Sequence, residues 1–140
     1  MPISAPVPVD ADTKHPSRET CDNINNNNWI KYYFTSAISS AIGAVYDNKF
    51  DLRARFAAYW GKVADVFSNS TSVIGYELMN EPWAGNIYED PSLLVPGVAD
   101  RQKLQPMYDE VNEAIRKSDR EHLILFQGVT WEVVVPIGER

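Results

Sequence analysis

Residues 73–83, VIGYELMNEPW, decide the fold class of this sequence. Residues 73–79 are apolar on both pleat faces apart from Glu77, which is typical of a strand buried in a parallel sheet between layers of helices. The run ends in Asn80-Glu81-Pro82-Trp83, so an amide and a carboxylate follow the C-terminal tip of the predicted strand. In α/β folds, functional groups gather at the carboxyl ends of the strands. This stretch therefore predicts a β/α unit and a candidate site at its tip.

Two helical patterns come before the strand. Aromatic and small residues recur at helical spacing over residues 28–46, which predicts a helix capped by Asn28. A second helix is predicted over residues 52–68 with Asp51 as its N-cap. Its apolar stripe, expected to pack into a core, consists of Phe56, Trp60, Val63, Ala64 and Phe67.

The order of elements continues after the strand. An irregular loop is predicted first, then a helix over residues 101–118, and a second buried strand over residues 123–126. Pro106 fits best in a first turn, so the regular part of this helix is expected to begin near Gln105. The stripe of this helix is Leu104, Met107, Tyr108, Val111, Ala114 and Ile115. Helix, strand, helix, strand indicates an α/β fold with parallel strands. Because two strands cannot bury these helices, we expect the chain to be a piece of a larger α/β domain.

Composition limits the class of protein. The 140 residues are 44% hydrophobic and 23% charged, which is typical of a globular domain. The formal net charge of −6 argues against a nucleic-acid partner, which would need a basic face. No apolar run is long enough to span a membrane, and no targeting signal is recognisable. Cys21 is the only cysteine, either a free thiol or the partner of a cysteine in a longer protein.

The residues at the strand tip are of types that can bind a sugar and transfer a proton to or from it. A carboxylate such as Glu81 can donate or accept a proton when its surroundings tune it. Asn80 can hydrogen-bond a hydroxyl through either end of its amide, and Trp83 offers a flat apolar face of the kind on which sugars stack. The alternative is a solvated turn after a strand. Nothing has metal-ligand spacing or a phosphate-binding glycine loop, so no metal or cofactor is expected.

A longer match favours the first interpretation. A buried strand ending in Asn-Glu-Pro resembles the fourth strand of the (β/α)8 glycoside hydrolases of the clan that includes family 5. Residues 73–85, 32–35, 93–101 and 129–131 together resemble the endoglycoceramidase group of that family. The resemblance implies the central portion of a TIM barrel, from the loop and helix after strand 3 through strand 5. Residues 29–140 would be β/α units of a partial catalytic domain, and residues 1–28 an irregular leader.

The resemblance also implies a retaining mechanism on a β-linked sugar, with glycosphingolipid as the substrate, cut between glycan and ceramide. Glu81 would be the acid/base and Asn80 would hold the 2-hydroxyl of the sugar. Trp29, Trp83 and Trp131 would contact substrate. The nucleophilic glutamate of the family follows the seventh strand, whereas this chain ends shortly after what resembles the fifth. The arginine and histidine that the resemblance implies on earlier strands are also absent, and His15 and His122 are poor substitutes. We therefore expect this chain alone to be inactive.

Several alternatives stay open. The substrate could be a plain β-glucan, as in a cellulase-like hydrolase of the same clan, or the chain could be a truncated, non-catalytic sugar- or lipid-binding protein. Glu77 is expected to be a structural group paired with a basic residue of another strand, and Glu132 a loop carboxylate. Glu89-Asp90 and Asp109-Glu110 are expected on solvated faces. The acceptor triplet Asn69-Ser70-Thr71 hints at a secreted or lysosome-like compartment.

Overall fold

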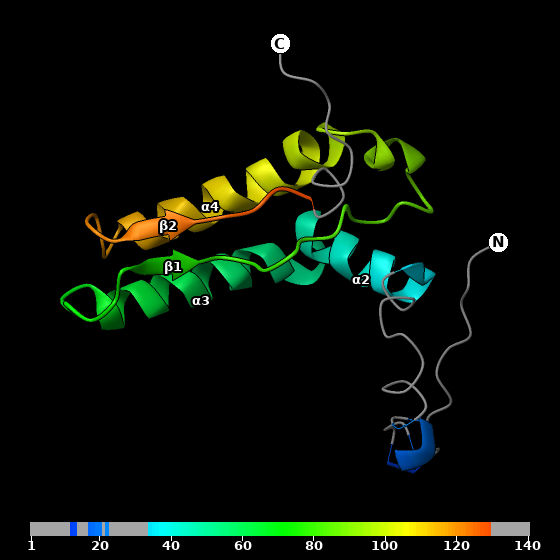
Figure 1. The fold of residues 1–140 in the computed structure, drawn as a ribbon, viewed down its shortest axis with the longest axis horizontal. Helices are drawn as coiled ribbons and strands as arrows, with labels where there is room; N and C mark the ends of the chain where they lie inside the picture. Colours follow the sequence, from blue (N-terminus) through cyan, green and yellow to red (C-terminus); the bar gives the residue numbers. More distant parts are fainter. Residues whose placement is uncertain (1–11, 14–16, 21, 23–33, 130–140) are drawn as a thin grey trace.

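The computed structural model describes residues 12–13, 17–20, 22 and 34–129. The elements follow the predicted order and are labelled in Figure 1: α2 (Ser36–Tyr46), α3 (Leu52–Phe67), β1 (Gly75–Glu77), α4 (Gln105–Arg116) and β2 (Leu123–Leu125). Short 3-10 turns at Lys49–Asp51 and Pro91–Leu94 and a π-helical turn at Asp100–Leu104 lie between them. The predicted sequence of helix, strand, helix and strand is confirmed.

β1 and β2 pair in parallel, as expected for neighbouring β/α units. Tyr76 pairs with Ile124 in the ladder, and Gly75 pairs with Leu123. The strands approach so closely that a Cβ at position 75 would lie 2.5 Å from the Leu123 carbonyl oxygen, so only glycine fits there. Both strands have three residues, shorter than the sequence predicted.

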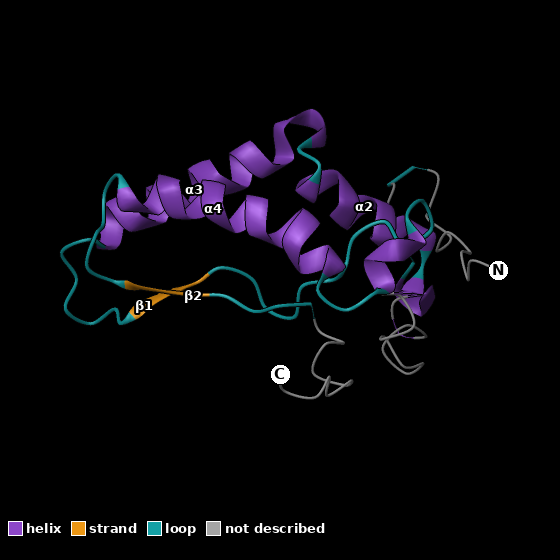
Figure 2. Cartoon of the chain, turned by 90° about the horizontal axis from the view of Figure 1, so that it is seen from above, coloured by secondary structure: helices purple, strands orange, loops and turns teal. Residues whose placement is uncertain are grey.

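Helices cover one face of this sheet. Figure 2 shows α3 and α4 side by side above the strands. Tyr76 and Leu78 are buried in the core, and the Tyr76 ring lies against Trp60 of α3 with centroids 6.2 Å apart. On the other face, Leu123 is 57% and Leu125 is 50% exposed. Ile74, just before β1, is 80% exposed. The prediction of a strand buried on both faces is therefore wrong for the described residues. The apolar residues predicted burial on both faces of the sheet, but helices cover only one face.

The core lies between the sheet and the α3–α4 pair. The predicted stripe of α4 is confirmed, since Leu104, Met107, Val111 and Ile115 are 0–1% exposed. Gly61 of α3 lies against Ala114, where a Cβ would stand 3.3 Å from the Ala114 carbonyl oxygen. On α3 itself, Ala57 and Ala64 are buried and Phe56, Trp60 and Val63 pack partly against the core, but Phe67 is 42% exposed.

The predicted helix starts need correction. Thr35 has extended backbone angles and its side chain accepts a hydrogen bond from the Ile38 N–H, so Thr35 caps α2 and a continuous helix over residues 28–46 is wrong. Asn28 lies outside the described residues. Asp51 does stand at the N-cap of α3, but its φ of 61° is left-handed and its side chain makes no capping bond. Asn48 Oδ1 accepts a hydrogen bond from the Ala54 N–H in its place.

Candidate active site

Asn80 and Glu81 stand where the sequence predicts, just beyond the C-terminal end of β1. The ladder continues one residue past the strand through the bond from the Leu78 N–H to the Leu125 carbonyl oxygen (3.0 Å). The chain then turns, and both Asn80 and Glu81 are exposed. Glu81 has a φ of 44°, in the left-handed region that non-glycine residues seldom adopt. A carboxylate and an amide are thus presented to solvent at the tip of a parallel strand.

The backbone at Glu81 is fixed from the neighbouring strand. The Gln127 side chain accepts a hydrogen bond from the Glu81 N–H through Oε1 (3.0 Å). Its Nε2 donates to Glu77 Oε1 (3.2 Å), so one amide side chain joins two carboxylate-bearing residues of the β1 segment. No sequence signal marked Gln127, because its role depends on the register of two strands that lie almost 50 residues apart along the chain.

Gln127 is itself held by α4. Its carbonyl oxygen accepts a hydrogen bond from the Tyr108 hydroxyl (2.8 Å), and burial raises the pKa of Tyr108 to about 12. Asp100 Oδ1 accepts a hydrogen bond from the Val129 N–H (2.9 Å) two residues further on. A shallow hollow of about 170 Å³ lies between the end of β2 and the start of α4.

Trp83 is not an open stacking platform. It is 5% exposed, its indole N–H donates to Ser39 Oγ (3.2 Å), and its ring meets Phe34 edge-on with centroids 5.1 Å apart. The buried hydroxyl of Tyr46 donates to the Trp83 carbonyl oxygen (2.7 Å). The sequence-based expectation of an exposed flat face is therefore wrong. Trp83 anchors the loop after Glu81 onto α2.

The other acidic candidates are placed as follows. Among the described residues Glu77 makes no ion pair, so the predicted basic partner does not appear there, and its bond comes from Gln127. Asp90 caps the 3-10 turn Pro91–Leu94, and Asp109 accepts from Gln105. Glu110 departs from the prediction of a solvated face, since it forms a half-buried ion pair with Arg53 of α3 (2.7 Å). Trp29, Trp131, Glu132, His15 and Cys21 lie outside the described residues.

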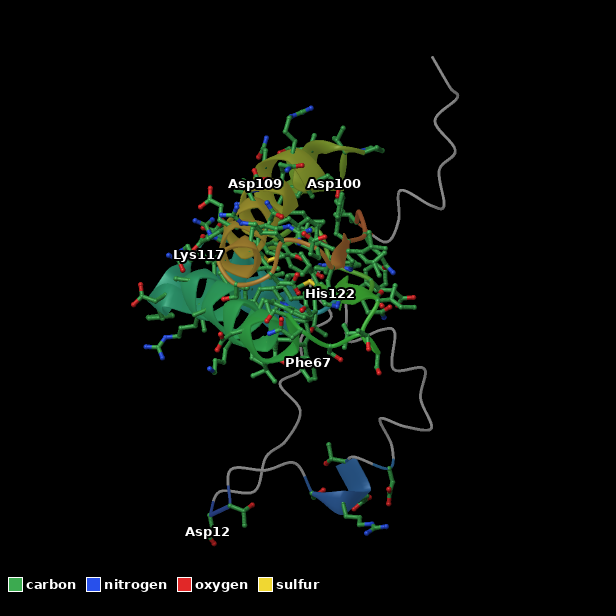
Figure 3. The ribbon with its side chains drawn as sticks, turned by 90° about the vertical axis from the view of Figure 1, so that its left-hand side faces the viewer. Asp12, Phe67, Asp100, Asp109, Lys117 and His122 are labelled. Atoms are coloured by element: carbon green, nitrogen blue, oxygen red, sulfur yellow. The ribbon has the colours of Figure 1, made fainter. Side chains whose placement is uncertain are left out.

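His122 lies at the opposite end of the strands, as the sequence indicated. Figure 3 looks at that end, with His122 near the turn that follows Phe67. Nδ1 contacts the buried Asp119 carboxylate (2.6 Å), and Nε2 contacts the Ser70 carbonyl oxygen (3.0 Å). Both partners are acceptors, so the doubly protonated ring satisfies both contacts. The Ser70 carbonyl above all, together with Asp119, raises the pKa of His122 despite the opposing effect of desolvation.

The described part of the chain holds no cluster of three or more His, Cys, Asp or Glu side chains that could bind a metal ion. Within the same residues, no helix combines the length and apolar character that crossing a membrane requires. The candidate site consists of Glu81 and Asn80, with the Gln127 side chain bonded to the Glu81 N–H.

A parallel β/α arrangement with a carboxylate at a strand tip has the form of a segment of a TIM-barrel enzyme. The family model for cellulase, glycosyl hydrolase family 5, matches residues 19–134, and the chain belongs to this family. Family membership, together with a similar solved structure, makes the fold that of part of a TIM barrel.

Within this family, the chain is similar to endoglycoceramidases. The chain is 48% identical over 132 residues to an endoglycoceramidase of Hydra vulgaris and 44% identical over 132 residues to one of Cyanea nozakii. These matches cover 94% of this chain but 25% and 26% of the two proteins, so the chain spans about a quarter of their length. A crystal structure of an endogalactoceramidase is similar with a TM-score of 0.58 and 29% identity, over 68% of this chain and 20% of that one. The predicted likeness to endoglycoceramidases is confirmed.

Proposed function

We propose that this chain forms the acid/base half of the active site of a retaining β-glycosidase that acts on glycosphingolipids. The observation that carries the proposal is the exposed Glu81 beside Asn80 at the carboxyl end of β1, in a chain of family 5. In barrel terms we assign β1 to strand 4 and β2 to strand 5. The chain then runs from the loop and helix after strand 3 to strand 5.

The proposed reaction has two steps. Glu81 gives its proton to the glycosidic oxygen as the bond from that oxygen to the anomeric carbon breaks and a second carboxylate bonds to that carbon. Glu81, now ionised, then takes a proton from water. The water oxygen bonds to the anomeric carbon and the glycosyl ester breaks, which returns both carboxyl groups to their starting states. Asn80 hydrogen-bonds the 2-hydroxyl of the same sugar.

The second carboxylate is proposed to come from a later strand of a complete barrel. Glu77 is a poor substitute because its Oε1 is bonded to Gln127, below the strand tip. We therefore propose that the 140-residue chain alone does not turn over substrate. Hydrolysis by the purified chain would contradict this.

The substrate class rests on the relatives. Two endoglycoceramidases are 44% and 48% identical to this chain, which favours a ceramide-linked glycan over a plain β-glucan. The net charge of −6 favours a neutral glycan over nucleic acid. The two alternatives are a cellulase-like specificity and a non-catalytic binding role, and the experiment below distinguishes both from the proposed activity.

The test is a chimera in which this chain replaces the matched 132 residues of the Hydra vulgaris endoglycoceramidase. We expect the folded chimera to release glycan from a glycosphingolipid, and Glu81→Gln to lower that rate by roughly 10²–10⁴-fold, the usual contribution of general acid–base catalysis. An aryl glycoside with an acidic phenol as leaving group needs no proton, so formation of the glycosyl-enzyme should survive in the variant and appear as a burst.

The matched control is Glu89→Gln, an exposed carboxylate of the loop after Trp83. A folded chimera without activity, or one whose Glu81→Gln variant still cleaves glycosphingolipid at the original rate, would overturn the proposal. Cleavage of a plain β-glucan in preference to glycosphingolipid would instead establish the cellulase-like alternative.

We also propose a secreted or lysosome-like compartment for the protein in which this domain works. Asn69, the acceptor of the Asn69-Ser70-Thr71 triplet, is exposed after α3 and so is open to glycosylation. Protein secreted from a eukaryotic host should carry a glycosidase-sensitive mass that Asn69→Gln removes. An unmodified Asn69 in the secreted protein would contradict the proposal.

A further inference from the structure

We infer that Gln127 is a positioning residue for Glu81: its side-chain amide fixes the backbone of the acid/base residue while it also bonds the Glu77 carboxylate. The inference rests on the proposed function of Glu81. It concerns a residue two positions past the end of β2, and it predicts an effect on catalysis from a side chain that takes no part in proton transfer.

The orientation of the Gln127 amide is determined by its two partners. The Glu81 N–H can only donate, so it needs the amide oxygen, which lies 3.0 Å away. The ionised Glu77 carboxylate can only accept, so it needs the amide nitrogen, which lies 3.2 Å away. A rotated amide would lose both bonds. Neither a carboxylate nor an ammonium group at this position could serve both partners.

Glu81 needs this support because the strand ladder has already ended. The last ladder bond joins the Leu78 N–H to the Leu125 carbonyl oxygen. Beyond it, Glu81 adopts a φ of 44°, a conformation that a non-glycine residue keeps only when its surroundings impose it. The Gln127 side chain supplies the hydrogen bond that the ladder no longer provides, on one side of the turn. Tyr46 holds the Trp83 carbonyl oxygen on the other side.

Gln127 transmits a fixed position because its own backbone is fixed. The Tyr108 hydroxyl donates to its carbonyl oxygen at 2.8 Å, and Gln127 closely follows β2, whose last residue, Leu125, pairs with Glu77 of β1. The position of the Glu81 backbone is therefore fixed, through Gln127, by α4 and by the segment that follows β2.

Neutrality of the side chain matters as much as its shape. Glu77 and Glu81 lie on the same segment, and the Gln127 amide bonds the carboxylate of Glu77 and the backbone N–H of Glu81. A carboxylate at position 127 would keep an acceptor for the Glu81 N–H but would face Glu77 with like charge and no proton to share. In the pair Glu77→Gln/Gln127→Glu, the carboxylate at position 127 accepts from the Glu81 N–H as before and now also accepts from the amide at position 77. Only the 77–127 bond reverses its donor and acceptor, and the net charge is unchanged.

The first measurement uses the 140-residue chain and needs no activity. Amide hydrogen exchange followed by NMR reports the Glu81 N–H directly. Because its bond is exposed to solvent, we expect Gln127→Met to speed exchange at Glu81 by only about three- to tenfold. The exchange of the buried Val111 amide should stay unchanged. Gln102→Met, the same substitution at an exposed glutamine of the π-helical turn, is the matched control.

The second measurement uses the chimera described above. We expect Gln127→Met to lower kcat by about tenfold or more, with little change in KM, because a displaced acid/base slows the chemical step more than binding. Gln127→Glu should be similarly impaired. The double variant Glu77→Gln/Gln127→Glu should recover both kcat and the slow exchange of the Glu81 amide.

The outcomes separate the two hypotheses. If Glu81→Gln leaves hydrolysis unchanged, the proposed function fails. If Glu81→Gln abolishes hydrolysis but Gln127→Met keeps the original kcat and the original exchange rate at Glu81, the positioning role fails. If Gln127→Met lowers kcat and the double variant does not recover it, Gln127 acts only in folding of the strand end and the inference is overturned.

Discussion

Replacing Tyr46 by phenylalanine tests the anchor that holds the loop after Glu81. The substitution removes the hydroxyl that donates to the Trp83 carbonyl oxygen at 2.7 Å and lies 4.0 Å from Met79 Sδ, and leaves the ring in place. Tyr46 is 2% exposed, so water does not readily replace the lost donor. A buried hydrogen bond of this kind contributes about 1.5 kcal/mol. The loss should lower the Tm by roughly 5 °C for a domain of this size.

The assay is urea unfolding of the chain followed by tryptophan fluorescence at low protein concentration, with thermal unfolding by circular dichroism as a second probe. Tyr59→Phe is the matched control, because Tyr59 is 60% exposed on α3 and its hydroxyl should contribute little. Equal unfolding midpoints for Tyr46→Phe and Tyr59→Phe would refute the argument that Tyr46 anchors the loop.

Three further predictions concern pH and the helix pair. The pKa of Tyr108 is raised to about 12, chiefly by burial. Its contribution to the free energy of unfolding is therefore complete below pH 10 and is lost as the pH rises toward 12. Urea unfolding midpoints measured across that range check this. The pKa of His122 is raised, so its contribution is complete below about pH 6.5 and declines as pH rises; His122→Gln should abolish this decline. A double-mutant cycle with Arg53→Met and Glu110→Gln should give a coupling of about 0.5 kcal/mol that added salt weakens, and zero coupling would contradict it.

The features that the sequence predicted well are those determined by local pattern. An apolar run that stops at Asn80 and Glu81 defined both the strand and the position of the candidate site. The α4 stripe followed helical spacing closely, because one face of that helix meets the core along its whole length. Pro106 in the first turn was likewise predictable, since proline lacks the N–H that the helix interior needs.

The features that the sequence missed depend on partners far along the chain. Trp83 carries both an apolar ring and a polar N–H, so its type alone fits a sugar platform or a core anchor. Ser39 on α2 decides the matter by accepting its indole N–H. Gln127 became recognisable only when strand pairing brought it to Glu81. The start of α2 was placed too early because the aromatic pattern before Thr35 resembles a helix but does not reveal the extended backbone of the cap.

The left-handed backbone of Glu81 also affects how this chain would respond to selection in the laboratory. A non-glycine residue at a φ of 44° costs on the order of 1 kcal/mol, and glycine there would relieve it. A library of the chain selected for thermal survival alone should therefore collect glycine or asparagine at position 81. A library of the chimera selected for glycosphingolipid cleavage should, on the proposed function, retain glutamate. Divergence of the two libraries at this single codon would separate the requirements of the fold from those of the reaction.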